Sequence, residues 1–267
     1  MNVRFFSRIQ RWPRVGSVSR LPAHGLRATL DLVFPAACAA CGRKMDRDRA
    51  HDLGSSLCES CLDQLELFSG PLCRRCGAPV PAVVEPQAHC IRCRGQRLWF
   101  DETVALGEYG GRLRELLLKM KQARGNVTSL ALAELTWQRH AEQLEALEAD
   151  VVVAVPMHWR RRWTHGTNSA AVLAEVFARR LRVRQRTRLL GRRRNTPPQF
   201  SLPPSKRWQN VRQAFSVKRG YPVQGAHVLL VDDIMTTGAT CSEAARTLKA
   251  AGAGRVSVVV VARTLVH

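Results

Sequence analysis

One stretch, Val228–Thr240, constrains the fold of this chain more than any other. It begins with four apolar residues, continues with the paired acids Asp232 and Asp233, and ends in the loop Thr236-Thr237-Gly238-Ala239-Thr240. A helix-forming run, residues 241–249, follows directly. A short apolar run bounded in this way is typical of a buried strand in a parallel sheet. We therefore expect a strand, a loop and a helix, with the loop at the ligand-binding edge of an α/β sheet.

The chemistry of this loop predicts a phosphate site. Its backbone N–H groups, threonine hydroxyls and glycine precede a helix N-terminus, which is where anions bind. Asp232 and Asp233 can accept hydrogen bonds from sugar hydroxyls and approach a divalent cation. A sugar phosphate with free hydroxyls next to the phosphate would use both halves of the stretch. No G-x-x-x-x-G-K-[S/T] sequence occurs, so an ATP-type P-loop is excluded.

Eight of the nine cysteines form four Cys-x-x-Cys pairs, which are Cys38/Cys41, Cys58/Cys61, Cys73/Cys76 and Cys90/Cys93. Each pair is typical of a zinc knuckle, and two knuckles complete a tetrahedral shell, so we expect two structural zinc ions. Disulfides are the alternative, and a reducing compartment argues against them. The spacing favours sequential pairing, which forms a double zinc ribbon, over the alternate pairing of a cross-braced module. The ninth cysteine, Cys241, is expected to be a small buried residue rather than a nucleophile.

The length of 267 residues suits one sizeable domain with a small appendage. We expect a flexible basic arm over residues 1–30, the cysteine-rich module over 31–98 and an α/β domain over 99–267. In that domain, strand patterns at 103–106, 151–155, 228–231 and 256–261 alternate with helical patterns, which indicates a doubly wound parallel sheet. Residues 191–215 contain four prolines and several arginines, and we expect a mobile loop there.

The net charge of +21 is concentrated in two parts of the chain. Residues 151–220 contain seventeen basic residues and one acid, Glu175, and residues 1–37 contain six basic residues and one acid. A local excess of this size favours a polyanionic partner. Nothing approaches 18 continuous apolar residues, so no membrane span is expected. The N-terminus lacks the apolar core of a signal peptide, and we therefore expect a cytoplasmic protein.

The stretch Val228–Thr240 resembles the phosphoribosyl-pyrophosphate (PRPP) motif of type I phosphoribosyltransferases. Further blocks resemble the ComF family, whose competence-associated members join a phosphoribosyltransferase-like domain to an N-terminal zinc module. These blocks are Pro156-Met157-His158-x-Arg160-Arg161, Gly166-x-Asn168, Asn195-Thr196-Pro197-Pro198-Gln199 and Asn210-Val211-Arg212-x-Ala214-Phe215. The resemblance runs from about Leu30 to the C-terminus and preserves the order of the blocks. It implies a doubly wound parallel sheet of the type I phosphoribosyltransferase type with a small N-terminal double zinc ribbon.

The resemblance also implies roles for individual residues. Asp232 and Asp233 would contact ribose hydroxyls and Mg²⁺-bound PRPP, and the 5′-phosphate would be held by Thr236, Thr237, Gly238, Ala239 and Thr240. Arg160 and Arg161 would face the pyrophosphate. The chain departs from the family at His165-Gly166-Thr167-Asn168-Ser169, where Arg-Gly-Phe-Asn-Gln is usual, and at Phe200-Ser201-Leu202, where Ala-Gly-Leu is usual. Both departures concern the pyrophosphate side of the site.

Two functions compete at this point. The resemblance implies a PRPP-binding protein that acts in DNA uptake and natural transformation, handling single-stranded DNA with a helicase-like ATPase as partner. Arginines with nearby aromatic residues suit such a strand through phosphate contacts and stacking, and the candidates are Arg162, Arg192, Arg193, Arg194 and Trp163. The alternative is an active phosphoribosyltransferase of nucleotide metabolism, in which a nucleobase or amine displaces pyrophosphate. No residue of the sequence identifies the acceptor.

Overall fold

The computed structural model describes residues 37–45, 56–81, 90–122, 125–157, 168–197, 202–218 and 220–265. After the short helix α3 (Glu59–Leu62), its elements are β1 (Glu102–Glu108), α4 (Gly111–Met120), α5 (Asn126–Ala146), β2 (Val151–Ala154), α7 (Ser169–Leu181), β3 (Arg184–Gln185), β4 (Leu190–Arg192), α8 (Pro204–Val211), β5 (Phe215–Val217), β6 (His227–Met235), α9 (Ala239–Ala250) and β7 (Arg255–Arg263). Of the predicted regions, the N-terminal arm lies outside the described residues.

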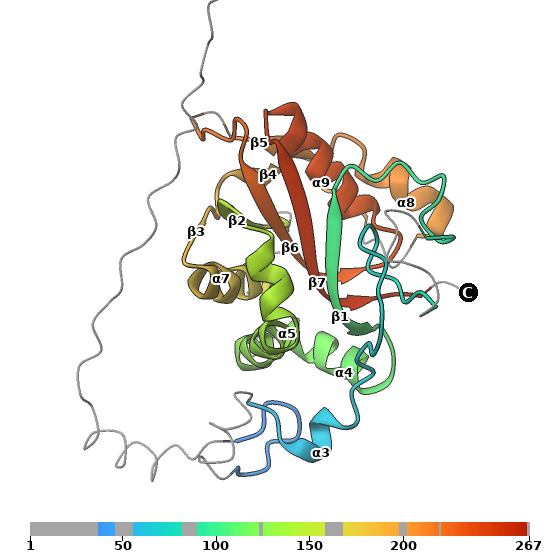
Figure 1. Ribbon diagram of the computed structural model, residues 1–267, viewed down its shortest axis with the longest axis vertical. Helices are drawn as coiled ribbons and strands as arrows, with labels where there is room; N and C mark the ends of the chain where they lie inside the picture. Colours follow the sequence, from blue (N-terminus) through green and yellow to red (C-terminus); the bar gives the residue numbers. More distant parts are fainter. Residues whose placement is uncertain are drawn as a thin grey trace, which may run out of the picture.

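A five-stranded parallel sheet in the order β1-β7-β6-β2-β3 forms the centre of the molecule. Helices α5 and α7 lie on one side of it and α9 on the other (Figure 1). The central strand β6 is apolar on both faces, because Leu229 and Val231 pack toward α5 and α7 whereas Val228 and Leu230 pack toward α9. Burial on both faces explains the uninterrupted apolar run in the sequence. The predicted α/β class with a parallel sheet is confirmed.

The expectation of a mobile loop over residues 191–215 is wrong for the described part of that region. Strands β4 and β5 pair as an antiparallel hairpin, and α8 lies between them in the chain. Pro204 begins α8, where a missing backbone N–H removes no helical hydrogen bond. Leu190 and Phe215 are buried in the core beside α9. Pro203 and Pro204 therefore start a helix instead of marking a loop.

The two cysteine-rich parts pack on opposite faces of the sheet. Cys38 and Cys61 belong to the core on the α5 and α7 face, whereas Cys73, Cys76 and Cys93 belong to the core on the α9 face. Between them the chain is tied to β1 by an isolated bridge from Leu67 to Gly107. The cysteine-rich segment is thus part of the core on both faces of the sheet.

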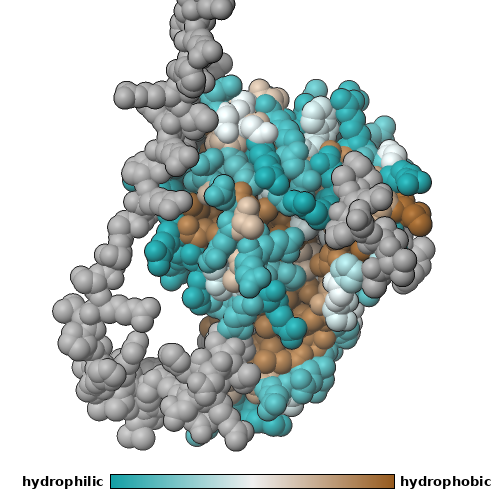
Figure 2. Space-filling view, viewed as in Figure 1, coloured by the Kyte–Doolittle hydropathy of each residue, from teal (hydrophilic) through white to brown (hydrophobic). Residues whose placement is uncertain are grey.

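Most of the visible surface is hydrophilic, but hydrophobic surface is present where α4 and α5 lie (Figure 2). The exposed large hydrophobic residues there are Leu118 on α4 and Val127 and Leu130 on α5. Leu113 and Leu117, on the opposite side of α4, are fully buried. Leu118 precedes residues 123–124, which lie outside the described part, and Val127 and Leu130 follow them.

Candidate functional site

The loop after β6 has the geometry of an anion site. Gly238 occupies the N-cap position of α9 in the left-handed region, with φ of +80°. Its carbonyl accepts the hydrogen bond of the Ser242 N–H at 2.8 Å, which starts the helix at once. The first N–H groups of a helix have no acceptor within it, and they attract an anion together with the helix dipole. A residue with a side chain is strained at this φ, which explains why glycine stands here.

The paired acids lie at the carboxyl half of β6, directly before this loop. Asp232 Oδ1 accepts a hydrogen bond from the Asp233 N–H at 2.9 Å, and Asp233 Oδ1 accepts one from the Ile234 N–H at 2.8 Å. These local bonds fix the direction of both carboxyl groups. Because β6 pairs with β2 on one side and β7 on the other, the pair is held by the middle of the sheet.

Burial and, after it, the negative charge of Asp233 together raise the pKa of Asp232 to about 8. The residue keeps some exposed surface, but protein atoms surround its carboxyl group. In the ligand-free protein Asp232 is therefore largely protonated at neutral pH. A ligand that brings a cation or hydroxyl donors to this carboxyl would favour its ionised form.

Two residues that sequence reasoning missed contact Asp233. Lys121 Nζ forms an ion pair with Asp233 Oδ2 at 3.3 Å, and Ser169 Oγ donates to the same oxygen at 3.3 Å. Lys121 follows α4 and Ser169 begins α7, so both come from parts of the chain far from the loop. Ser169 stands in the departure from the family pattern, which could have drawn attention to it. No local signal marks Lys121.

Cys241 lies in α9, behind the loop Thr236–Thr240 that was predicted to bind phosphate (the phosphate loop), and is buried, as expected. Its Sγ is 3.8 Å from Asp232 Oδ2. Burial raises the pKa of this thiol well above its ordinary value, and the neighbouring Asp232 acts in the same direction. Cys241 is therefore a protonated thiol at neutral pH, which excludes a role as an activated nucleophile.

The eight cysteines form two sites of four, with sequential pairing of the knuckles. Cys38, Cys41, Cys58 and Cys61 form the first, and Cys73, Cys76, Cys90 and Cys93 the second. All nine cysteines of the chain are free of disulfides. Zinc–sulfur bonds of about 2.3 Å in a tetrahedron place the sulfur atoms about 3.8 Å apart. The observed separations fit, at 3.8 Å for Cys41 and Cys58, 3.8 Å for Cys73 and Cys93, and 3.6 Å for Cys76 and Cys90.

Without a metal, the thiols of these sites have unequal pKa values. Burial raises the pKa of Cys61 to about 12 and that of Cys93 to about 11, whereas a hydrogen bond from Ser60 lowers the pKa of Cys58 to about 6. Thiolates held this close repel one another, and a bound metal removes that repulsion. Two structural zinc sites with complete four-thiolate shells account for the arrangement, and such shells leave no position for a reacting molecule.

The arginines proposed for nucleic acid fall into two groups. Arg162 lies outside the described residues, as do the candidate Trp163 and the two arginines predicted to face the pyrophosphate, Arg160 and Arg161. Arg193 and Arg194 help to line a pocket of about 550 Å³, together with Gln213, Phe215, Arg246, Thr247 and Ala250. A helix rises about 1.5 Å per residue, so Thr247 lies about 12 Å along α9 from Ala239. The pocket is therefore beside the far half of α9 and not beside the phosphate loop.

Arg192 differs from its two neighbours. Its guanidinium lies over the Phe215 ring, 5.5 Å from the centroid, and its Nη2 donates to the Thr196 hydroxyl. These contacts hold the β4–β5 hairpin together.

In the described part of the chain, no helix combines the length and the apolar character that a membrane span requires.

Comparison with known proteins identifies both parts of the chain. A double zinc ribbon domain matches residues 29–94 and a phosphoribosyl transferase domain matches residues 167–265. The chain is 32% identical to the DNA utilization protein YhgH of Escherichia coli O6:H1 over 197 residues, which covers 73% of this chain and 85% of the relative. It is 29% identical to Competence protein F of Haemophilus influenzae, with 79% and 92% covered, and 25% identical to Competence protein ComFC of Bacillus subtilis, with 72% and 77% covered.

The double zinc ribbon match precedes the phosphoribosyl transferase match in the chain, which is the order of the two parts in the structure. The relatives are covered over most of their length, so the likeness concerns the whole architecture and not a single motif. The chain therefore belongs to the ComF family of competence-associated, phosphoribosyltransferase-like proteins.

Proposed function

We propose that this protein binds PRPP at the loop between β6 and α9. The single observation that carries the proposal is Gly238 in the left-handed conformation at the start of α9, immediately after the acid pair. Thr236, Thr237, Gly238, Ala239 and Thr240 hold the 5′-phosphate. A phosphate there accepts hydrogen bonds from the N–H groups at the start of α9. The carboxyl groups lie on the side of the phosphate toward which the ribose would extend.

Asp232 and Asp233 accept hydrogen bonds from the ribose hydroxyls and lie close to the Mg²⁺ that accompanies PRPP. In the ligand-free protein Lys121 neutralises Asp233, and the cation would supply positive charge to the same carboxyl pair. Mg²⁺ prefers oxygen ligands and is commonly held by one or two carboxylates together with substrate phosphates. Arg160 and Arg161 complete the site on the pyrophosphate side.

Isothermal titration of PRPP with Mg²⁺ tests this proposal, with Asp232→Asn/Asp233→Asn as the site variant. Each lost acceptor should cost about 1–3 kcal/mol of binding free energy. Glu175→Gln is a control, because that carboxyl pairs with Arg179 on the exposed surface of α7. Equal affinity of the parent and the double variant would refute the site.

The alternative is an active transferase of nucleotide metabolism, in which a nucleobase or amine attacks C1 of PRPP and pyrophosphate leaves. Positioning and charge stabilisation would supply the catalysis. Pyrophosphate release in the presence of PRPP, Mg²⁺ and a panel of bases and amines separates the two functions. Release that depends on the acceptor would establish the transferase, and tight binding without release supports a binding role.

A second candidate function is single-stranded DNA binding, and the arginine-lined pocket favours it. Arg193, Arg194 and Arg246 line it together, although Arg246 is also paired with Glu243, and such cations can contact the phosphates of a single strand. The names of the relatives, which refer to competence and DNA utilization, point in the same direction. We therefore propose a cytoplasmic role in DNA uptake and natural transformation, together with a helicase-like ATPase.

The salt dependence of oligonucleotide binding tests this surface. Arg193→Gln/Arg194→Gln should reduce the slope of log K against log salt by about 1.4, since each phosphate contact on a single strand contributes about 0.7. Arg192 is left intact because it holds the hairpin. The control variant removes the same charge from exposed residues of the α7 end, as Arg179→Gln/Arg182→Gln. A slope that changes equally in both variants, or in neither, would refute the pocket as the DNA surface.

A further inference from the structure

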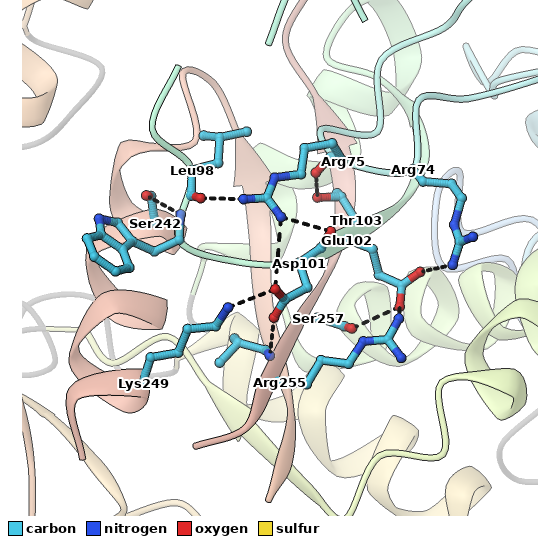
Figure 3. Close-up of polar contacts among 12 residues, drawn as sticks. Arg74, Arg75, Leu98, Asp101, Glu102, Thr103, Ser242, Lys249, Arg255 and Ser257 are labelled. Carbon is cyan, nitrogen blue, oxygen red and sulfur yellow. Dashed lines mark hydrogen bonds and ion pairs between the residues drawn. The ribbon is translucent and has the colours of Figure 1, made fainter. Parts of the chain in front are cut away.

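The second zinc ribbon is joined to the α/β domain by a dense polar junction (Figure 3). Glu102, at the start of β1, forms ion pairs with Arg74 of the ribbon and with Arg255 of β7. The neighbouring Asp101 accepts Lys249 Nζ from α9 at 2.7 Å and the Val256 N–H at 2.8 Å. Figure 3 shows these side chains converging from the ribbon, β1, β7 and α9. The ribbon is thus fixed to the start of β1 and to β7, and the start of β1 is tied to the far end of α9, the helix that begins at the loop.

One side chain connects the metal knuckle to the loop itself. Arg263, at the end of β7, is only 8% exposed. Its Nε donates to the carbonyl of Cys76 at 3.0 Å, and its Nη1 donates to the carbonyl of Met235 at 3.1 Å. Cys76 is a ligand of the second site and Met235 is the last residue before the phosphate loop. A buried guanidinium needs acceptors, and this one has the carbonyls of Cys76, Met235 and Thr264.

A second connection reaches the first turn of α9. Ser242 is fully buried, and its hydroxyl accepts the Trp99 N–H at 3.0 Å and donates to the carbonyl of Arg97 at 3.3 Å. Both partners belong to the segment that leaves the last knuckle. Leu98 and Phe100 of that segment lie beside Gly238, within 3.6 Å of where a β-carbon would stand. The loop therefore rests on the chain that the second zinc site organises.

We propose that the second four-cysteine site braces the phosphate loop, and that Arg263 is the positioning residue that carries this support. With zinc held by Cys73, Cys76, Cys90 and Cys93, the Cys76 carbonyl is fixed and Arg263 holds Met235 in place. A zinc ion with four thiolates is anionic overall, which favours a buried cation beside it. Loss of the metal or oxidation of these thiols frees the knuckle, and the loop loses its fixed edge. The consequence for PRPP rests on the proposed function, whereas the effect on the loop does not.

The first site offers a contrast within the same molecule. Lys119 Nζ donates to the carbonyls of Ala39 and Ala40 in the first knuckle, each at 3.0 Å. Lys119 thus ties its own knuckle to α4, but its side chain is exposed, whereas that of Arg263 is buried. It lies on α4, on the other face of the sheet, and its hydrogen bonds are to the first knuckle. Lys119→Met is therefore the matched control for Arg263→Met.

The test is amide hydrogen exchange of the full chain with its metal bound, read at the peptide that spans residues 235–241. Arg263→Met should exchange about tenfold faster there, because the Met235 carbonyl loses its charged hydrogen bond and keeps only the one from the Thr264 N–H, at 3.0 Å. Arg263→Lys should restore part of the protection. Lys119→Met should leave this peptide unchanged, and both variants should keep the zinc content of the parent. Unchanged exchange in Arg263→Met with zinc retained would overturn the proposal.

Two further measurements keep the result unambiguous. If Arg263→Met does not fold, Ser242→Ala carries the test, since it removes the second connection while deleting only one oxygen atom. Faster exchange at residues 235–241 supports the brace, and unchanged exchange overturns it. PRPP titration is then made with each variant, and about tenfold weaker binding is expected only where exchange rises. A parent protein that binds no PRPP would refute the proposed function while the exchange result still decides the brace.

Discussion

Replacing Gly238 by alanine tests whether backbone conformation makes the phosphate loop. An alanine β-carbon would lie 3.5 Å from Leu98 Cδ2 and 3.6 Å from Met235 Sδ and Phe100 Cζ, which are ordinary contact distances. Steric overlap therefore contributes little. The cost comes from φ of +80°, and a non-glycine residue in the left-handed region loses about 1–2 kcal/mol. We expect the free energy of unfolding to fall by that amount.

Gly220→Ala is the matched control for this prediction. Gly220 has φ of +88° with nothing within 4 Å of an added β-carbon, so it carries the same conformational cost outside the phosphate loop. Both variants should lower the melting temperature by about 2–4 °C per kcal/mol lost. Only Gly238→Ala should also weaken PRPP binding, by about tenfold, because relaxation of φ turns the loop amides and removes a charged hydrogen bond.

The assays are urea unfolding and PRPP titration of the parent and both variants. Gly238→Asn provides a further check, since asparagine tolerates the left-handed region and should recover part of the lost stability. The reasoning is refuted if Gly238→Ala is as stable as the parent. It is also refuted if the stability falls as expected while the PRPP affinity of Gly238→Ala matches that of Gly220→Ala.

The remaining predictions concern the acid pair, the zinc sites and the core. Because the pKa of Asp232 is raised to about 8 in the ligand-free protein and PRPP with Mg²⁺ requires its ionised form, PRPP affinity should rise up to about tenfold per pH unit from pH 7 to 8 and then level off. Asp232→Asn should lack that rise, and a flat profile in the parent would contradict the ionisation. Cys58→Ser should lower the zinc content from two ions to one and lower solubility without a direct effect on the phosphate loop, as measured by elemental analysis and titration. Gly107→Ala should cost about 3 kcal/mol in urea unfolding, because its β-carbon would lie 2.4 Å from the Glu66 carbonyl oxygen; a loss below that of Gly220→Ala would show that the strand adapts.

Local features of the sequence were sufficient to predict the strand, loop and helix around Gly238 and the two groups of four cysteines. The run before Asp232 is apolar because β6 is buried on both faces, and a strand of that kind is recognisable without knowing its neighbours. Glycine is favoured at position 238 because of a single backbone angle, the positive φ of that residue. Cys-x-x-Cys pairs are equally local, since each knuckle places two thiols on one turn. In each case the determining interaction spans only a few residues.

The tertiary structure decided the contacts between distant parts of the chain. Lys121 meets Asp233, and Arg263 joins Cys76 to Met235, only because the sheet brings the ends of separate strands and helices to one edge. The β4–β5 hairpin likewise forms because Phe215 is buried against α9, and this burial outweighs the loop-like composition of prolines and arginines around it. A single sequence records which residues are apolar or charged. Which of them share a buried junction depends on packing energies summed over the whole fold, and no short pattern contains that sum.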